Sequence, residues 1–230
     1  MKRKKFYLNM IVLILLAELY SCQGRAPYNS PVFPLQNGNY WDFSGKYNQK
    51  TINFRIEVRN VVRKKSLTFA LMRGFPTDVM TGDDWEASSW GLLIAGSEHY
   101  YRISGPRMDT VMKKMNTDGI ALTEMVTDAD LFLETLYDTG QTFGEAAQLT
   151  RDDGNYYWRV IGKSAFDPSA IKGLQLTGPF DQYTLSYRTQ PDETLMDIVP
   201  GIGITRYRYI HHGTSEELDL RLTSLNIRGK

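Results

Sequence analysis

The chain is poor in the two residue types that most often bind metals or act as nucleophiles. Its 230 residues include one cysteine, Cys22, and three histidines, His99, His211 and His212. A single thiol excludes an internal disulfide, and no other thiolate is available to a metal or a substrate. Adjacent strand residues point to opposite faces, so His211 and His212 are expected at a solvated hairpin end rather than on one metal. Nucleophile-elbow, Walker, zinc-protease and paired Cys-x-x-Cys motifs are absent as well.

The chain also has no excess of either charge. It contains 27 Lys and Arg against 26 Asp and Glu. Four of the basic residues and one acidic residue fall in the first 21 positions, which leaves 23 basic and 25 acidic residues after them. Nucleic-acid-binding domains usually show a clear basic excess, so we expect no nucleic-acid partner. The 42% hydrophobic content favours a folded domain over a disordered chain.

No hydrophobic run is long enough to span a bilayer. The apolar stretch at 10–17 is short of the roughly 20 residues that a transmembrane helix needs. Four basic residues precede it at 2–5, and the tetrapeptide Leu-Tyr-Ser-Cys follows it at 19–22. A positive head, a short apolar middle and a small residue before a cleavage point are typical of a secretory signal peptide. We therefore predict a signal peptide over residues 1–21.

The tetrapeptide at 19–22 resembles the lipobox of bacterial lipoproteins. In that family the cysteine thiol is diacylated before the signal is cleaved on its amino side. The resemblance implies that Cys22 begins the mature chain and carries fatty acyl chains such as palmitate. These chains are expected to hold the protein on a membrane, because each buried CH₂ gains about 0.8 kcal/mol. The alternative is a buried core thiol, which is the commoner fate of a free cysteine.

The rest of the chain divides into a linker and one domain. Residues 22–36 contain three prolines and no periodicity, which predicts an extended tether. The alternative is an irregular strand along the domain edge. Residues 37–230 are expected to form the β-rich domain. An aromatic residue follows three positions after both Gly38 and Gly140, which favours two similar sub-lobes at 37–126 and 138–230.

Most of the domain alternates apolar and polar residues with the period of a half-buried strand. Strands are expected at 52–58, 67–71, on both sides of 95–97, and at 119–125, 156–161, 183–187, 204–211 and 218–222. A short helix is expected at 130–137. Repeated strands with little helical periodicity predict an all-β fold, either an antiparallel sandwich or a strongly curved sheet.

Two phrases near the ends of the domain carry a second resemblance. The first reads Phe-Pro-Leu-x-x-Gly-Asn-x-Trp at 33–41, and the second reads Val-Pro-Gly-Ile-Gly-Ile at 199–204. Together they resemble the opening and closing segments of uncharacterised bacterial cell-envelope lipoproteins. The resemblance implies an all-β lipoprotein that faces the periplasm or the cell surface. It supplies no catalytic residue.

The same phrases have a physical interpretation. Gly38 is expected in a positive-φ turn before a strand. Trp41 is expected in the core, where its indole N–H needs a partner. Gly201 and Gly203 predict a bend or bulge that leads into a strand. A phosphate-binding loop would need another glycine where Arg206 stands, so no nucleotide site is expected.

Three acidic clusters could offer oxygen ligands to a cation. They are Asp83-Asp84, Asp128-x-Asp130 and Asp152-Asp153-Gly154. None completes the ligand register of a calcium loop, which ends in a bidentate Glu. Asp, Asn and Gly tolerate left-handed backbone, so residues 152–155 predict a hairpin turn instead. We expect no metal and no cofactor.

Aromatic residues are the best candidates for ligand contact. Neighbouring rings at 85–90, 100–101 and 156–158 face opposite sides of a strand, so one ring of each group can be exposed. The predicted ligand-binding residues are Trp85, Trp90, Tyr101 and Trp158. The alternative is cross-strand packing, which contributes about 0.2–1 kcal/mol per pair.

These observations favour a non-catalytic lipoprotein whose β domain binds or scaffolds a lipid, a glycan or a partner protein of the cell envelope. Two alternatives stay open. An envelope hydrolase would act on a glycan or ester with Asp or Glu and His99, and it requires a pocket with two carboxylates or His99 beside a carboxylate and a hydroxyl. A carbohydrate-binding module would use exposed aromatic rings. Residues 23–25 lack the acidic stretch that accompanies surface export in some bacteria, so attachment to the outer membrane, facing the periplasm, is expected.

Replacing Cys22 with Ala tests the anchor. We expect the variant to incorporate no labelled palmitate and to leave the membrane fraction, because it has no thiol to acylate. Fractionation with radiolabelled palmitate measures both effects. A variant that still sediments with membranes and carries label contradicts the prediction.

Overall fold

The computed structural model describes residues 31–82, 88–96, 98–118, 121–135, 138–174 and 180–227. The predicted signal peptide, Cys22 and the first part of the predicted tether lie outside these residues. No helix within the described part has the length and apolar character needed to cross a membrane.

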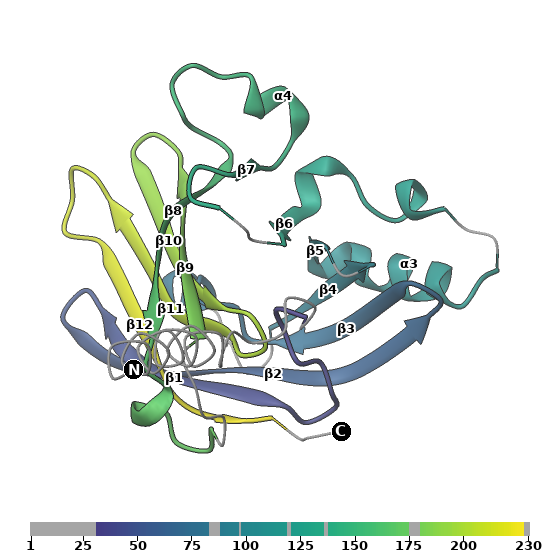
Figure 1. Ribbon diagram of the computed structural model, residues 1–230, viewed down its shortest axis with the longest axis horizontal. Coiled ribbons are helices and arrows are strands. Elements are labelled where there is room, and N and C mark those ends of the chain that lie inside the picture. Colours follow the sequence, from purple (N-terminus) through teal and green to yellow (C-terminus); the bar gives the residue numbers. More distant parts are fainter. Residues whose placement is uncertain are drawn as a thin grey trace, which may run out of the picture.

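Twelve strands form one sheet in the described part of the chain (Figure 1). They are β1 (Tyr40–Tyr47), β2 (Lys50–Lys64), β3 (Leu67–Arg73), β4 (Ser89–Ala95), β5 (His99–Ile103), β6 (Leu131–Glu134), β7 (Thr142–Phe143), β8 (Trp158–Phe166), β9 (Phe180–Arg188), β10 (Asp192–Val199), β11 (Gly203–His211) and β12 (Glu217–Asn226). The order across the sheet is β6-β5-β4-β3-β2-β1-β12-β11-β10-β9-β8-β7. Every neighbouring pair is antiparallel.

The sheet is strongly curved, as the strand pattern predicted. The pairing of β1 with β12 lies at its centre and joins the N-terminal and C-terminal halves of the chain. From this pair the two halves rise as two arms, and the edge strands β6 and β7 approach each other at the far side (Figure 1). The inner, concave face carries the main core, which includes Trp41, Phe43 and Leu220. The prediction of an all-β fold with a curved antiparallel sheet is confirmed.

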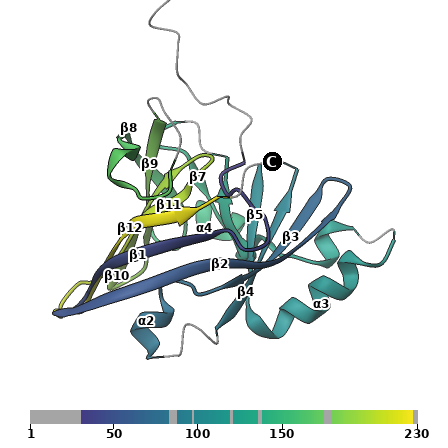
Figure 2. The same cartoon turned by 90° about the horizontal axis from the view of Figure 1, so that it is seen from below.

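Helices are few and short in the described part of the chain. They are α2 (Asp78–Thr81), α3 (Gly105–Met115), α4 (Ala146–Leu149) and the 3₁₀ helices η1 (Leu122–Glu124), η2 (Asp128–Asp130) and η3 (Pro168–Ala170). Helix α3 lies alongside β3 and β4 on the outer face of the sheet (Figure 2). Its Val111 and Met115 pack there against Phe69, Leu93 and Ile103, which form a second small core. Sequence analysis did not find α3, because its polar composition hides a narrow apolar stripe.

The two phrases that carry the envelope-lipoprotein resemblance contact each other. The indole N–H of Trp41 donates to the Ile202 carbonyl at 2.5 Å, so the predicted core position and partner are both confirmed. Gly203 has φ 101°, and a Cβ there would lie 3.0 Å from the Phe33 ring. Only glycine fits both constraints without strain. The Gly201 N–H also donates to the Pro31 carbonyl at 3.0 Å.

The last residues of the expected tether belong to the core. Val32, Phe33 and Leu35 are 3–5% exposed. The Val32 N–H donates to the Tyr100 hydroxyl at 2.9 Å, which ties this segment to β5. Residues 31–36 are therefore neither a free tether nor an edge strand but an irregular segment packed into the core, and the folded domain begins before residue 37.

Two local predictions are wrong. The strand expected at 119–125 contains η1 instead, where Glu124 folds back to accept from the Ala121 N–H at 3.3 Å. The helix expected at 130–137 is strand β6 over its first half. There Asp130 accepts from the Thr127 N–H at 2.8 Å and closes the preceding turn, and the chain then adds to the sheet edge beside β5.

The turns before β1 and β7 share one geometry. Gly38 has φ 80°, as predicted, and Gly140 has φ 96°. Their N–H groups donate to the carbonyls of Val58 and Val160 at 2.8 and 2.7 Å, and each valine N–H donates back to the residue after the glycine. A one-residue register shift follows both valines. The internal repeat stays a prediction, and this matched geometry supports it.

Replacing Trp41 with Phe tests the hydrogen bond between the Trp41 indole and the Ile202 carbonyl. The Ile202 carbonyl would lose its partner in the core, so we expect the free energy of unfolding to fall by about 1–3 kcal/mol. Urea unfolding followed by circular dichroism measures the loss. Trp158→Phe is the matched control, because its indole makes no hydrogen bond with the described residues. Equal losses in the two variants contradict the prediction.

Candidate functional site: a cavity on the concave face

A cavity of about 620 Å³ opens on the concave face, where the two arms of the sheet approach each other. Its lining draws on β5, β6, β8, β9, β10 and β11 together with η2 and the start of α4. Six aromatic rings and several charged side chains line it. The rings are Phe75, Phe132, Tyr156, Trp158, Tyr187 and Tyr207. Residues from both halves of the chain therefore meet in one site.

Phe75 is the centre of the aromatic wall. Its ring makes edge contacts with Trp90 at 5.3 Å, Phe132 at 6.0 Å and Tyr207 at 6.1 Å between centroids. Asp78 accepts from the Phe75 N–H at 2.7 Å and so holds the turn that carries the ring. Edge-to-face contacts of this kind add about 0.5–1.5 kcal/mol each beyond buried area, so the wall is well ordered.

Trp158 extends the wall on the opposite arm. Its ring lies 6.3 Å from Phe132, 6.4 Å from Phe143 and 5.2 Å from Tyr187. Phe143 is buried, whereas Trp158 and Tyr187 are half-buried and keep part of their surface toward the cavity. The Trp158–Tyr187 pair therefore offers aromatic surface to a ligand.

Arg102 is the cation of the cavity. On β5 it follows the alternation that turns Tyr100 inward, so it reaches the concave face. Its guanidinium lies 3.6 Å over the Phe75 ring and makes no hydrogen bond or ion pair with the described residues. The surrounding walls desolvate the guanidinium and lower its pKa, although its surface remains open to the cavity. Arginine stays protonated in proteins, so the cavity contains an unneutralised positive charge.

The acidic groups come from η2 and the start of α4. Asp130 forms an ion pair with Arg107. Burial works to raise the pKa of Asp130, but hydrogen bonds from Arg107 and Thr127 outweigh it and keep this pKa below its usual range. The Asp128 and Glu145 carboxylates line the cavity without a hydrogen bond or ion pair to the described residues. They remain available to donors on a ligand.

Tyr156 occupies a strained backbone conformation at the cavity. Its φ is 67°, a region that bulky residues rarely adopt. The Tyr156 N–H donates to the Arg188 carbonyl at 2.7 Å, and the Arg151 guanidinium lies 4.7 Å from the ring centroid. The side chain is 37% exposed. Strain of this kind is most often found where a side chain serves a site.

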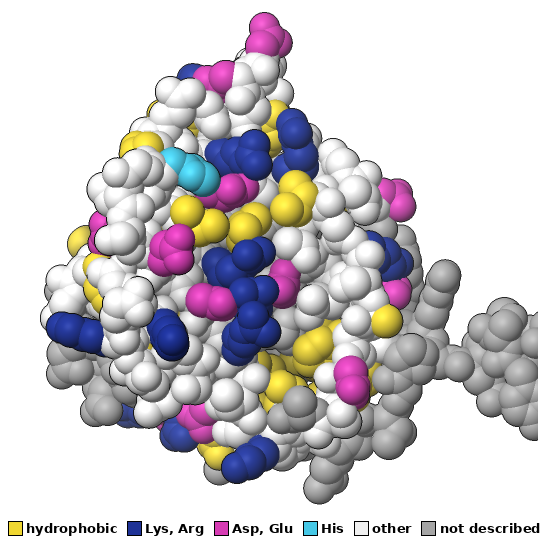
Figure 3. Space-filling model, turned by 90° about the vertical axis from the view of Figure 1, so that its left-hand side faces the viewer, with side chains coloured by type: hydrophobic (Ala, Val, Ile, Leu, Met, Phe, Trp, Pro, Cys, Tyr) yellow, Lys and Arg dark blue, Asp and Glu magenta, His cyan; other side chains and the backbone are white. Residues whose placement is uncertain are grey.

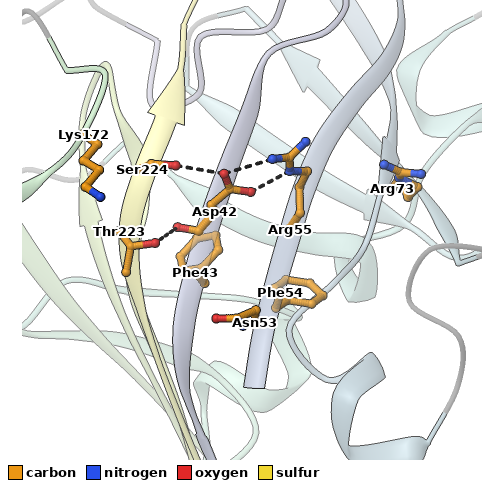
Figure 4. Close-up of a pocket in the computed structure, with 9 residues that line it drawn as sticks. All are labelled: Asp42, Phe43, Asn53, Phe54, Arg55, Arg73, Lys172, Thr223 and Ser224. Atoms are coloured by element: carbon orange, nitrogen blue, oxygen red, sulfur yellow. Dashed lines mark hydrogen bonds and ion pairs between the residues drawn. The ribbon is translucent and has the colours of Figure 1, made fainter. Parts of the chain in front are cut away.

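A second hollow of about 490 Å³ lies on the outer face near β1, β2 and β12 (Figure 4). At its centre Asp42 accepts from Arg55 at 2.5 and 3.0 Å and from the Ser224 hydroxyl at 2.8 Å. Thr223 donates to the Asp42 carbonyl at 3.1 Å. Because these polar groups bind one another, the hollow leaves less for a ligand than the concave cavity does.

The outer face is polar, and several of its basic side chains form ion pairs with acidic neighbours. Lys and Arg side chains stand in a column there, with Asp and Glu beside them (Figure 3). Arg206 pairs with Asp219 through bonds of 2.8 and 2.6 Å, and Arg188 pairs with Glu193 at 2.9 Å. These part-buried pairs leave few free charges on this face. The cavity on the inner face is therefore the better candidate site.

The four predicted aromatic residues have different places. Trp158 lines the cavity. Trp90 is 4% exposed, donates to the Gly74 carbonyl at 2.8 Å and supports Phe75 from behind. Tyr101 lies on the other face of β5 and packs against the α3 core. Trp85, like Cys22, lies outside the described residues. Ligand binding by these residues stays a prediction.

The residues considered for chemistry are dispersed. His99 Nε2 lies 3.8 Å from Glu134, and His99 is not part of the cavity lining. His211 Nδ1 lies 2.6 Å from Asp192. In the described part of the chain, no three His, Cys, Asp or Glu side chains are placed to share a metal ion. Residues 152–155 form a turn, in which the Asn155 N–H donates to Asp153 at 3.0 Å. This turn connects α4 to β8, so the predicted turn is present but is not a hairpin.

Sequence analysis missed most of the cavity. Phe75, Arg102 and Tyr207 come from three distant segments, and only the curvature of the sheet brings them together. One signal was present: Arg102 interrupts the apolar side of a strand, two residues after a buried Tyr100. A charge at an inward position marks either a buried ion pair or a site.

Comparison with known proteins adds two distant structural likenesses. No family model matches the chain, and no curated protein matches it. A protein from Bacteroides fragilis described as exported, with a YmcC-like fold, aligns with a TM-score of 0.42 and 12% identity over 86% of this chain and 99% of its own. A protein from Parabacteroides distasonis described as a lipoprotein aligns with a TM-score of 0.37 and 11% identity over the same shares. Similarity this low carries no conclusion about function.

Two variants at position 156 test the strained backbone. Tyr156→Gly and Tyr156→Ala both remove the ring, but only glycine adopts φ 67° without cost. We expect the Gly variant to be more stable than the Ala variant by about 1 kcal/mol in urea unfolding. At Tyr187, in regular strand β9, the order should reverse, because Gly weakens a strand interior. Equal stability of the two variants at 156 contradicts the prediction.

Proposed function

We propose that this protein is a lipoprotein of the bacterial cell envelope that binds a glycan in the concave cavity without catalysing a reaction. Acyl chains on Cys22 attach it to the outer membrane, and the domain faces the periplasm. The single observation that carries the binding role is the composition of the cavity lining. There, partly exposed aromatic rings and charged groups without an ion-pair partner line the same cavity.

This composition suits a sugar better than an acyl chain. A sugar ring has an apolar C–H face that stacks on aromatic rings such as Trp158 and Tyr187, and a rim of hydroxyls that donates to carboxylates such as Asp128 and Glu145. An acyl chain has no polar group for these carboxylates. It would desolvate them without a hydrogen bond, which is unfavourable by several kcal/mol. Among the lining residues, only Ala129 and Leu131 offer aliphatic surface.

The acid–base groups support binding rather than hydrolysis. A glycosidase needs a carboxylic acid with a raised pKa to protonate the leaving oxygen. Asp130 has a lowered pKa, because Arg107 and Thr127 stabilise its charged form. His99, the other candidate for proton transfer, lies away from the cavity beside Glu134. The cavity thus offers aromatic rings and carboxylates that can bind a sugar, but Asp130 is not suited to act as the general acid of a glycosidase.

Glycan binding can be tested with the full chain purified in detergent. We expect it to retain members of a glycan array, and Trp158→Ala to weaken binding of the best glycan about tenfold or more by isothermal titration calorimetry, which corresponds to about 1.4 kcal/mol. Ile161→Ala is the matched control, because it removes a 46% exposed apolar side chain outside the cavity. Urea unfolding of each variant separates lost binding from lost folding.

Two results would overturn the proposal. One is an array without retained glycans together with a phospholipid or fatty acid that co-purifies in the cavity, identified by mass spectrometry. The other is turnover of the bound glycan by the purified chain, which would favour the hydrolase alternative.

A further inference from the structure

The Arg102 guanidinium is available to a ligand, because no described residue of this chain accepts its hydrogen bonds. It stacks 3.6 Å above the Phe75 ring, which covers one flat face of the guanidinium. Its N–H donors lie in the plane of the group, so stacking leaves them free. None of them bonds to the described residues. Two other cations near the cavity are neutralised instead, since Arg107 pairs with Asp130 and Arg151 pairs with Asp153.

The carboxylates nearby do not neutralise Arg102. No carboxylate of the described residues forms an ion pair or a hydrogen bond with Arg102, and Asp78 and Tyr207 act on its pKa through their charges alone. Asp78 is itself occupied, since it accepts from the Phe75 N–H and from the Ser88 hydroxyl. Burial raises the pKa of Tyr207 to about 12, so this phenol stays neutral beside the guanidinium.

The cavity lining therefore holds charged groups of both signs that have no ion-pair partner among the described residues. They are the Arg102 guanidinium, which lies over Phe75, and the Asp128 and Glu145 carboxylates. The Arg102 side chain is exposed, and a neutral sugar would satisfy the carboxylates with hydroxyls but would cover the guanidinium without pairing its charge. A cation that a ligand removes from water gains most from an anion that accepts two parallel hydrogen bonds.

We infer that the glycan bound here is acidic, and that its carboxylate or sulfate binds the Arg102 guanidinium while its hydroxyls face Asp128 and Glu145. This inference rests on the proposed glycan binding and names the class of sugar. It makes Arg102 the residue that sets specificity, whereas Trp158 supplies affinity for acidic and neutral sugars alike.

The test uses matched pairs of glycans that differ only in charge. Sialyllactose is paired with lactose, an oligogalacturonate with its methyl ester, and a sulfated with an unsulfated chondroitin oligosaccharide, next to the neutral members of the array. We expect the full wild-type chain to bind at least one acidic member about tenfold or more tightly than its neutral partner. Added salt should reduce that preference, because it screens the charge pair.

Variants assign the preference to one residue. Arg102→Gln should reduce affinity for the acidic member to that for its neutral partner and leave the neutral affinity unchanged. Arg102→Lys should restore only part of the loss, because an ammonium cannot form the bidentate fork. Glu145→Gln is the control for the ratio of the two affinities. It also changes one charge in the lining and should weaken binding of both members through the lost hydroxyl contact, but it should leave the acidic preference intact or increase it.

Each outcome decides between the two proposals. Equal binding of acidic and neutral partners by the wild-type chain, or retention of neutral glycans only, overturns the acidic-ligand inference and leaves glycan binding standing. An acidic preference that persists in a folded Arg102→Gln variant also overturns it. If the chain retains no glycan at all, both proposals are overturned. The wild-type comparison decides the question even if an Arg102 variant fails to fold.

Discussion

The antiparallel pairing of β1 with β12 holds the molecule together. It joins strands from opposite ends of the chain, and the Trp41 N–H bond to the Ile202 carbonyl locks the inner side of this junction. Without the pair, the two halves would be separate sheets with exposed edges, which are prone to wrong pairing. The curvature of the joined sheet then turns the two arms toward each other and makes a cavity between them.

The cavity follows from the rule that alternate strand residues share a face. On most inner positions these residues are apolar and fill the core. Toward the edges, inner positions of β5, β8 and β9 carry Arg102, Trp158 and Tyr187, which line the cavity instead of filling the core. Polar groups can lie at these places because a cavity admits water or a ligand, whereas in the closed core they would remain unpaired. The strained Tyr156 is a further exception in this region, and exceptions to local rules concentrate at sites.

Single residues show where sequence reasoning works. Trp41, Gly38 and the alternating segment around Phe54 and Ile56 have the predicted environments, because each depends on neighbours within a few residues or on burial alone. The segment 119–125 and the start of 130–137 were assigned wrongly, since side-chain bonds from Glu124 and Asp130 close short turns there. Of the predicted ligand residues that the structure describes, Trp158 lines the cavity and Trp90 and Tyr101 do not.

Sequence alone determined the all-β class and several strand hairpins, and it predicts an export signal that ends at a cysteine, because each of these features depends on a contiguous stretch of residues. Only the tertiary structure decided which face of which strand meets a cavity. Phe75, Arg102, Trp158 and Tyr207 are brought together by the closure of β1 on β12 and by the bend of the sheet. The pairing of β1 with β12 is a contact between segments far apart in the sequence. No local pattern in either segment shows which strand it will pair with.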